Sequence, residues 1–313
     1  MLVTIFGGTG FVGRAIINLL ARTYPATALQ IRVATRNPDK AEFLRQLGDV
    51  GQITPYACDP ADAAQVQRAV LGSANVINCI GQLAESRGNK FDRVQGEIPG
   101  IIARAIQTAA PHARLIHLSA IGTDANSSSK YARSKAAGEG VIRAILPGAT
   151  ILRPSIVFGP DDRFFNRFAK MALLSPALPL IGGGETRLQP VYVGDVAQAV
   201  MVAMNAPATQ RQIFELAGPA VYSFADLLRL MLKQIGRERC LVTLPWGLAL
   251  LQGSVLEHLP GKVLTRDQVK LLQQDNVASG VLPGLAQLGI TPTAIEAILP
   301  TYLDRFKPRG RFR

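Results

Sequence analysis

Three residues whose chemistry suits proton transfer lie close together in the sequence: Ser119, Tyr131 and Lys135. Tyr131 and Lys135 are four positions apart in a segment with helical periodicity, so both side chains lie on one face of the predicted helix. An ammonium group lowers the pKa of a neighbouring tyrosine, which can then exchange a proton with a carbonyl or hydroxyl. The hydroxyl of Ser119, at the end of a predicted strand, can orient that oxygen. The pattern predicts an acid–base site.

The start of the chain has the order strand, glycine turn, helix. An apolar segment, 2–6, precedes the turn, and an apolar-periodic segment, 15–20, follows it. Glycines allow a sharp turn and a close approach to a ligand, while the unpaired N–H groups at a helix N-terminus suit a pyrophosphate. We therefore expect a dinucleotide here. The residues expected to contact it are Gly7, Thr9, Gly10, Phe11, Val12, Gly13 and Arg14.

Basic residues near the end of the second predicted strand favour NADP(H) over NAD(H). An acidic residue at this place would bind the free ribose hydroxyls of NAD(H), but the chain has Arg36. A guanidinium binds a phosphate with two hydrogen bonds, and Lys40 and Arg14 could reach the same phosphate. Surface cations with no ligand are the alternative, and NAD(H) is the second choice of cofactor.

Further cofactor contacts are expected where the third and fourth strands end. Asp59 can accept a hydrogen bond from the adenine amino group, or it can cap the next helix. Asn78 and Gly81 follow the fourth strand and are expected along the ribose and phosphate. A plain turn is the alternative for Gly81.

Strand and helix patterns alternate through the first half of the chain. The predicted strands are 2–6, 29–35, 53–58, 75–80, 115–118 and 150–153, and the helices between them include 37–47, 61–71, 95–109 and 129–145. This alternation predicts an α/β fold, a Rossmann-type doubly wound parallel sheet, with right-handed crossovers.

After residue 155 the pattern changes to glycine- and proline-rich joints and further helices, at 224–235, 246–259 and 265–274. We expect residues 1–155 to form the NADP(H)-binding domain, with 188–218 returning to it. Residues 156–187 and 219–313 are then a smaller, mostly helical C-terminal lobe for substrate or partner. Trp246 and the leucines after it are expected in the core of this lobe or, alternatively, on an apolar tunnel or a membrane-facing surface.

The composition indicates a globular protein that prefers anionic partners. Of 313 residues, 48% are hydrophobic and 18% charged, and the formal net charge is +12. Basic residues gather in the tail 305–313, either as a solvated end or as a contact with an anionic membrane or a partner. No nucleic-acid-binding module and no metal-ligand spacing is present, so neither partner is expected. An apolar strand is predicted to start at Leu2, and no apolar run is long enough to span a membrane. We therefore expect a cytoplasmic protein; the alternative is a peripheral protein at the inner face of the membrane.

Several segments resemble one protein family. The glycine turn, the Tyr131/Lys135 pair and the ending Leu152-Arg153-Pro154 are similar to the atypical or extended short-chain dehydrogenase/reductase superfamily. The segments 127–139, 154–164 and 189–196 resemble the large NADPH-binding accessory subunit family of respiratory complex I. The resemblance covers most of the chain up to about residue 218.

The resemblance implies tight NADPH binding, with Pro154 among the contacts, and a structural or sensing role beside a respiratory or quinone-related complex. The alternative is an active oxidoreductase or epimerase that uses Ser119, Tyr131 and Lys135 on a hydrophobic carbonyl or a nucleotide sugar. In the first case Tyr131 and Lys135 anchor the nicotinamide ribose. Two departures from the family are the short interval from Ser119 to Tyr131 and Gln95 near a position where relatives carry asparagine. Arg153 is expected to bind an acidic substrate or to pair with a carboxylate such as Asp195.

Overall fold

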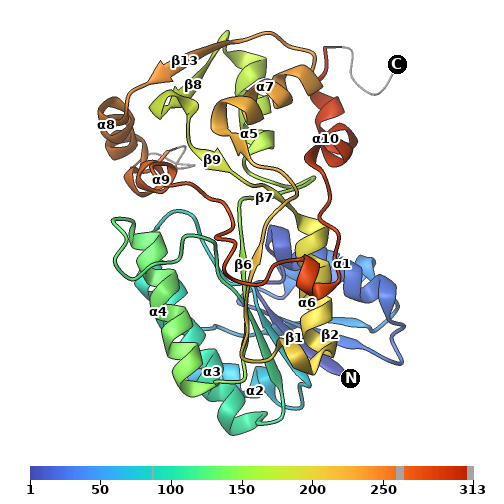
Figure 1. Ribbon diagram of the computed structural model, residues 1–313. Coiled ribbons are helices and arrows are strands. Elements are labelled where there is room, and N and C mark those ends of the chain that lie inside the picture. Colours follow the sequence, from blue (N-terminus) through green and yellow to red (C-terminus); the bar gives the residue numbers. More distant parts are fainter. Residues whose placement is uncertain (87, 259–263, 309–313) are drawn as a thin grey trace.

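The computed structural model describes residues 1–86, 88–258 and 264–308, with the main sheet below and a smaller lobe above it in Figure 1. The main sheet has seven parallel strands in the order β11-β6-β5-β4-β1-β2-β3, and it confirms the predicted Rossmann-type fold. Its strands are β1 (Leu2–Phe6), β2 (Gln30–Thr35), β3 (Ile53–Ala57), β4 (Asn75–Asn78), β5 (Arg114–Leu118), β6 (Thr150–Pro154) and β11 (Ile213–Leu216).

Helices cover both faces of this sheet, as the apolar residues on both sides of its strands require. The helices are α1 (Phe11–Thr23), η1 (Asp39–Leu47), α2 (Ala63–Val70), η2 (Asp92–Glu97), α3 (Ile98–Ala109), α4 (Lys130–Ile145), α6 (Val193–Asn205) and η4 (Pro207–Thr209). One buried core contains apolar residues of α1, α6 and the strands. A second core joins α2, α3 and α4 to the opposite face.

The helix predicted to begin at residue 95 starts earlier and irregularly. η2 is a π-helical segment that leads into α3, and Gln95 lies within it, buried. Gly138 of α4 lies against this segment, since a Cβ there would come within 2.1 Å of the Gln95 carbonyl oxygen. Close packing of two backbones therefore fixes α4, which carries Tyr131, against the sheet domain.

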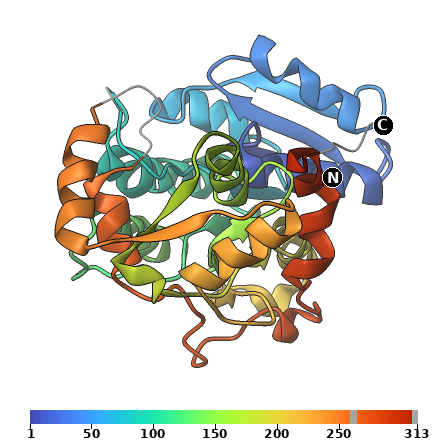
Figure 2. The same cartoon turned by 90° about the horizontal axis from the view of Figure 1, so that it is seen from above.

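The smaller lobe is assembled from segments that are distant in sequence. Its helices are α5 (Phe165–Leu174), η3 (Gly182–Gly184), α7 (Phe224–Gln234), α8 (Trp246–Leu256), α9 (Arg266–Leu272), α10 (Ile295–Leu303) and η6 (Asp304–Phe306). The short helix η5 (Ala286–Leu288) lies between α9 and α10 in the sequence. Short strand pairs join them: β7 (Val157–Phe158) with β10 (Val191–Tyr192), β8 (Ala177–Ile181) with β13 (Cys240–Leu244), and β9 (Arg187–Leu188) with β12 (Tyr222–Ser223). A view from above shows this lobe lying over the sheet (Figure 2).

One segment of the predicted small lobe packs against the sheet domain. Leu285, Leu288 and Ile290, assigned to the small lobe, pack in the main core with α6 because their segment runs back along the sheet domain. The boundaries at 155, 188 and 218 stay predictions. The helix predicted to end at residue 259 ends at Leu256 in the structure, and residue 259 itself lies outside the described residues. Residues 309–313 of the basic tail also lie outside them.

Candidate functional site

The carboxyl edge of the main sheet gathers most of the predicted site residues. In a parallel sheet all strands end at the same edge, so loops that follow different strands become neighbours there. The predicted residues that end these strands or follow them are Gly7, Arg36, Asp59, Asn78, Gly81, Ser119 and Pro154. The small lobe lies above this edge in Figure 1.

The glycine turn leaves no space for side chains at two positions. Gly7 has φ +78°, and a Cβ there would lie 2.9 Å from the carbonyl carbon and oxygen of Cys79. A Cβ on Gly13 would lie 2.4 Å from the Gly7 carbonyl oxygen. Helix α1 begins after Gly10 with no side-chain cap and no acidic residue in its first turn. Its N-terminus therefore fits an anion such as a pyrophosphate.

The other residues of this turn differ in exposure. Thr9 and Gly10 are exposed, while Val12 packs on the main core. The ring of Phe11 lies beside Gly159 of the other lobe, 3.4 Å from the place of a Cβ there. Phe11 therefore lies at the joint between the lobes.

The three cations expected at the adenosine phosphate have different surroundings. Arg36 and Lys40 are exposed after β2. The Arg14 guanidinium makes an ion pair of 3.0 Å with Asp161 of the other lobe, and its Nε is buried without a hydrogen-bond partner. Arg36 and Lys40 thus present their charge to solvent, whereas Arg14 links the glycine turn to the small lobe.

Asp59 and Asn78 both have hydrogen bonds within the protein. Asp59 is exposed and accepts from the Ala61 N–H at 3.0 Å, but the alternative that it caps the helix is wrong, since Asp62 caps α2. Asn78 is buried; its Oδ1 accepts from the Ile80 N–H, and its Nδ2 lies 3.1 Å from His117 Nδ1. Asn78 therefore shapes the loop after β4, and its contact with a ribose stays a prediction.

Lys135 brings two of the predicted regions together. Its Nζ donates to the carbonyl oxygen of Leu118, next to Ser119, at 3.0 Å, and lies 3.5 Å from the place of a Cβ on Gly81. Gly81 therefore lies next to the ammonium, and a side chain there would contact it. The Ser119 hydroxyl is buried and hydrogen-bonds Thr123 at 3.2 Å. The ring of Tyr131 packs edge-on against Phe91, with centroids 5.9 Å apart.

The electrostatics of the pair differ from the expectation. Burial, and then the carboxylate of Asp267, raise the pKa of Tyr131 to about 12 rather than lowering it. Burial lowers the pKa of Lys135 to about 8, although Glu139 and Cys79 act in the opposite direction. Tyr131 is therefore a weaker acid here than an ordinary tyrosine, and it is protonated at neutral pH.

Arg153 pairs with a carboxylate, as one of the two expectations had it, but the carboxylate is Glu139 and not Asp195. Its Nε and Nη2 contact the Glu139 carboxylate at 2.9 and 2.6 Å, a bidentate pair between β6 and α4. Asp195 instead accepts from the N–H and hydroxyl of Thr293. Glu139, one turn after Lys135, was not singled out in the sequence, although the four-residue spacing could have drawn attention to it.

Trp246 and the leucines after it were expected either in the core of the small lobe or on an apolar surface, and α8 has residues of both kinds. Trp246 and Leu250 pack on the core of the small lobe, and Trp246 lies directly against Gly182. Leu248, Leu251 and Val255 on the same helix are exposed by 52%, 62% and 60%. One side of α8 is therefore core and the other is an apolar surface.

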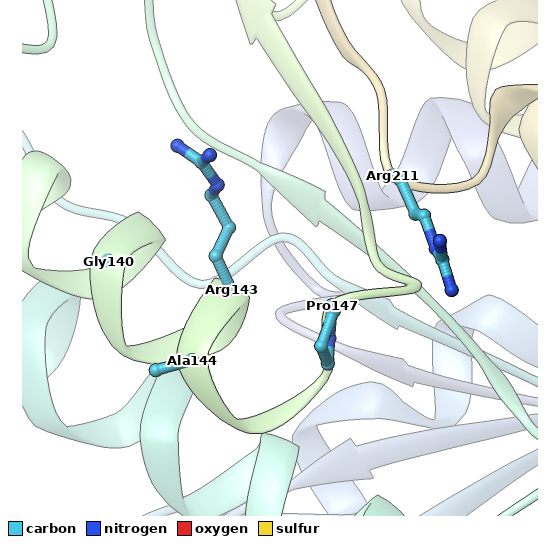
Figure 3. A pocket seen from close by; sticks show the side chains of 5 residues that line it. All are labelled: Gly140, Arg143, Ala144, Pro147 and Arg211. Carbon is cyan, nitrogen blue, oxygen red and sulfur yellow. The ribbon is translucent and has the colours of Figure 1, made fainter.

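A surface hollow of about 460 Å³ lies at the far end of α4 from Tyr131 and contains none of the predicted residues (Figure 3). It is lined by Gly140, Arg143, Ala144, Pro147 and Arg211. Among the described residues no three or more histidine, cysteine or acidic side chains are placed to hold a metal ion. The predicted residues therefore meet at the sheet edge and not at this hollow.

Comparison with known proteins identifies the family. The model of the NAD dependent epimerase/dehydratase family matches residues 3–217, the segment that contains the whole carboxyl edge described above. The chain belongs to the NAD dependent epimerase/dehydratase family. Within this family it is related to subunit 9 of the NADH dehydrogenase [ubiquinone] 1 alpha subcomplex, a mitochondrial protein. The mouse (Mus musculus) protein of that name is 35% identical over 302 residues, 95% of this chain and 78% of the relative.

Other proteins that are similar to this chain have different names. A protein of Caulobacter vibrioides named ceramide reductase is 29% identical over 249 residues, 78% of this chain and 73% of the relative. An NADPH-dependent quinone oxidoreductase of Escherichia coli, solved with NADPH, superposes with a TM-score of 0.75 at 20% identity. That superposition covers 96% of this chain and 98% of the other, and it shows a shared fold.

Proposed function

We propose that the protein binds NADP(H) at the carboxyl edge of its main sheet and is an accessory subunit of a respiratory or quinone-linked complex. The observation that carries the proposal is the glycine turn, where Gly7 and Gly13 admit no side chain and α1 begins without a cap. The names of the mitochondrial relatives support the choice of partner.

Several of the predicted residues have a place in this proposal. The first N–H groups of α1 bind the pyrophosphate, and Arg36, with Lys40 nearby, binds the 2′-phosphate that distinguishes NADP(H) from NAD(H). Lys135, beside Gly81, holds the nicotinamide ribose. When bound, the cofactor supplies a hydride donor or acceptor.

The surface of the small lobe supports docking at the periphery of a larger assembly. α8 exposes Leu248, Leu251 and Val255, and the chain has a formal net charge of +12. Exposed apolar side chains on a chain with a net positive charge fit an anionic membrane surface or the membrane arm of a complex. Within the described residues no helix has the length and apolarity needed to cross a bilayer.

A second candidate is an active oxidoreductase or epimerase. The placement of Tyr131 and Lys135 one turn apart on α4, with Lys135 bound to the carbonyl oxygen of Leu118 next to Ser119, favours it, because a phenol held there could donate a proton to a carbonyl oxygen as a hydride reaches the carbon. The hydroxyl of Ser119 lies at the same sheet edge and could orient that oxygen.

One experiment separates the two candidates. The protein is purified without added nucleotide, the nucleotide that it retains is identified by mass spectrometry, and its oxidation by a panel of quinones and ketones is followed by fluorescence. We expect retained NADPH that none of these compounds oxidises. Turnover that is lost in Tyr131→Phe, with NADPH binding kept, would establish the enzyme instead. A protein with no NADP(H) and no affinity for it would contradict both.

A further inference from the structure

A carboxylate of the small lobe binds the N-terminus of the helix that carries Tyr131 and Lys135. Asp267 of α9 accepts three hydrogen bonds: from the Ser129 hydroxyl at 2.9 Å, the Lys130 N–H at 2.7 Å and the Tyr131 N–H at 3.1 Å. These donors lie 136 to 138 positions away in sequence. The contact therefore joins the two lobes at the first turn of α4.

This contact adds to a cap that α4 already has. The Ser129 hydroxyl oxygen accepts from the Ala132 N–H at 3.3 Å, as an N-cap serine does. Asp267 accepts from the two N–H groups just before that of Ala132, those of Lys130 and Tyr131, which have no partner inside the helix. A negative charge at this end is also favoured by the helix dipole, so the interaction is both directional and charge-assisted.

Helix α9 also contacts a second element of the proposed nicotinamide site. The Gln268 side chain donates to the carbonyl oxygen of Leu83, in the loop that follows β4 and contains Gly81. α9 is itself tied to α8 by the ion pair between Arg266 and Glu257. It thus links the loop with Gly81 to the helix with Tyr131.

The geometry points to a positioning role, and we propose that Asp267 fixes the first turn of α4, and with it Tyr131, against the small lobe. Release of this carboxylate frees the phenol and opens the nicotinamide end of the site. The identity of the ligand in this inference rests on the proposed function; the effect on Tyr131 does not. The raised pKa of Tyr131, to which the Asp267 charge contributes, agrees with this contact.

The test compares Asp267→Asn with a matched control. Asp226→Asn alters another carboxylate of the small lobe, which accepts from the Ser223 hydroxyl in the first turn of α7. The first measurement needs no cofactor: nitration of Tyr131 by tetranitromethane, quantified by mass spectrometry against Tyr222 in the same sample. We expect Tyr131 to react about tenfold faster in Asp267→Asn, since charge-assisted bonds are lost, and at the wild-type rate in Asp226→Asn.

A second variant removes one donor and keeps the carboxylate. Lys130→Pro deletes an N–H at the first helical position, where proline is tolerated, and the preceding Ser129 has the extended backbone that proline requires. It is expected to speed nitration of Tyr131 by a smaller factor. The second measurement, release of NADPH by stopped-flow fluorescence, is expected to show the same order of rates.

The outcomes separate this inference from the proposed function. Unchanged nitration of Tyr131 in folded Asp267→Asn, or in folded Lys130→Pro if the first variant does not fold, would overturn the positioning role. Faster nitration in a protein that binds no NADPH would keep that role and contradict the proposed function. Faster nitration with an unchanged rate of NADPH release would show that Asp267 positions Tyr131 only. It would overturn the proposed effect of Asp267 on the nicotinamide end of the site.

Discussion

The two lobes supply different kinds of group to the same region. The sheet domain supplies mainly backbone and loop residues, such as the turn at Gly7 and Gly13 and the loop with Gly81. The small lobe reaches this region with carboxylate side chains, Asp161 to Arg14 and Asp267 to the first turn of α4. The difference indicates a division of labour in which the sheet domain contacts a ligand and the small lobe fixes the parts that do so.

The largest expected effect is on the small lobe itself. Asp162, 3% exposed, accepts from the Phe165 N–H at 2.7 Å and from the Tyr302 hydroxyl at 2.6 Å, so it ties α5 to α10. Asp162→Ala leaves these donors buried without a partner, and we expect a loss of about 3 kcal/mol in the free energy of unfolding.

Differential scanning calorimetry checks this and sharpens the comparison. The small lobe of Asp162→Ala is expected to melt before the sheet domain. Asp161→Ala, which removes only an exposed ion pair, is the control and should lose less than about 1 kcal/mol. A single unshifted transition in Asp162→Ala would contradict the independent core of the small lobe.

The next effect is on the backbone of the sheet domain. In Gly13→Ala the new Cβ meets the Gly7 carbonyl oxygen, so the turn must move. We expect the dissociation constant for NADPH, from a fluorescence titration, to rise about a hundredfold. Gly140→Ala, on α4 with open space around the new Cβ, should leave affinity unchanged. Equal affinities in the two variants would remove the glycine turn from the site.

A smaller effect concerns the free energy of unfolding, which the burial of Lys135 lowers. Because burial lowers the pKa of Lys135 to about 8, the folded state disfavours its charged form. Below pH 8 this penalty is fully present, and it disappears as pH rises from about 8 toward the ordinary lysine value, since the unfolded chain then binds the extra proton. Lys135→Met is therefore expected to stabilise the cofactor-free protein by about 2 kcal/mol at pH 7.

Thermal melts of the wild type and Lys135→Met across this pH range provide the measurement. The gap between the two proteins should narrow from pH 8 to pH 10. A gap that stays constant, or a variant less stable at pH 7, would show that the hydrogen bond to Leu118 outweighs the burial of the charge.

Six of the seven strands of the main sheet were predictable from the sequence because each has a local apolar pattern and helical segments alternate with them, whereas β11 was not among the predicted strands. Strand ends then had to meet at one edge, which gave the positions of Gly7, Arg36 and Ser119. The small lobe was less predictable, since β8 and β13 are more than fifty positions apart in the sequence and no pattern in either segment indicates that they pair.

The errors at the site have the same origin. The bidentate partner of Arg153 is Glu139, a choice set by the register of α4 on β6, which no local pattern gives. The pKa of Tyr131 was predicted from its neighbour Lys135 alone. Burial and Asp267, which depend on tertiary structure, shift it in the opposite direction.

The measurement that tests the central claim most directly is a titration of the nucleotide-free protein with NADPH and with NADH, repeated on Arg36→Ala. We predict that NADPH binds about tenfold more tightly than NADH, and that Arg36→Ala removes most of this difference by weakening NADPH binding alone. Equal or tighter binding of NADH would contradict the assignment of NADP(H), and binding of neither nucleotide would contradict the site at the carboxyl edge of the sheet.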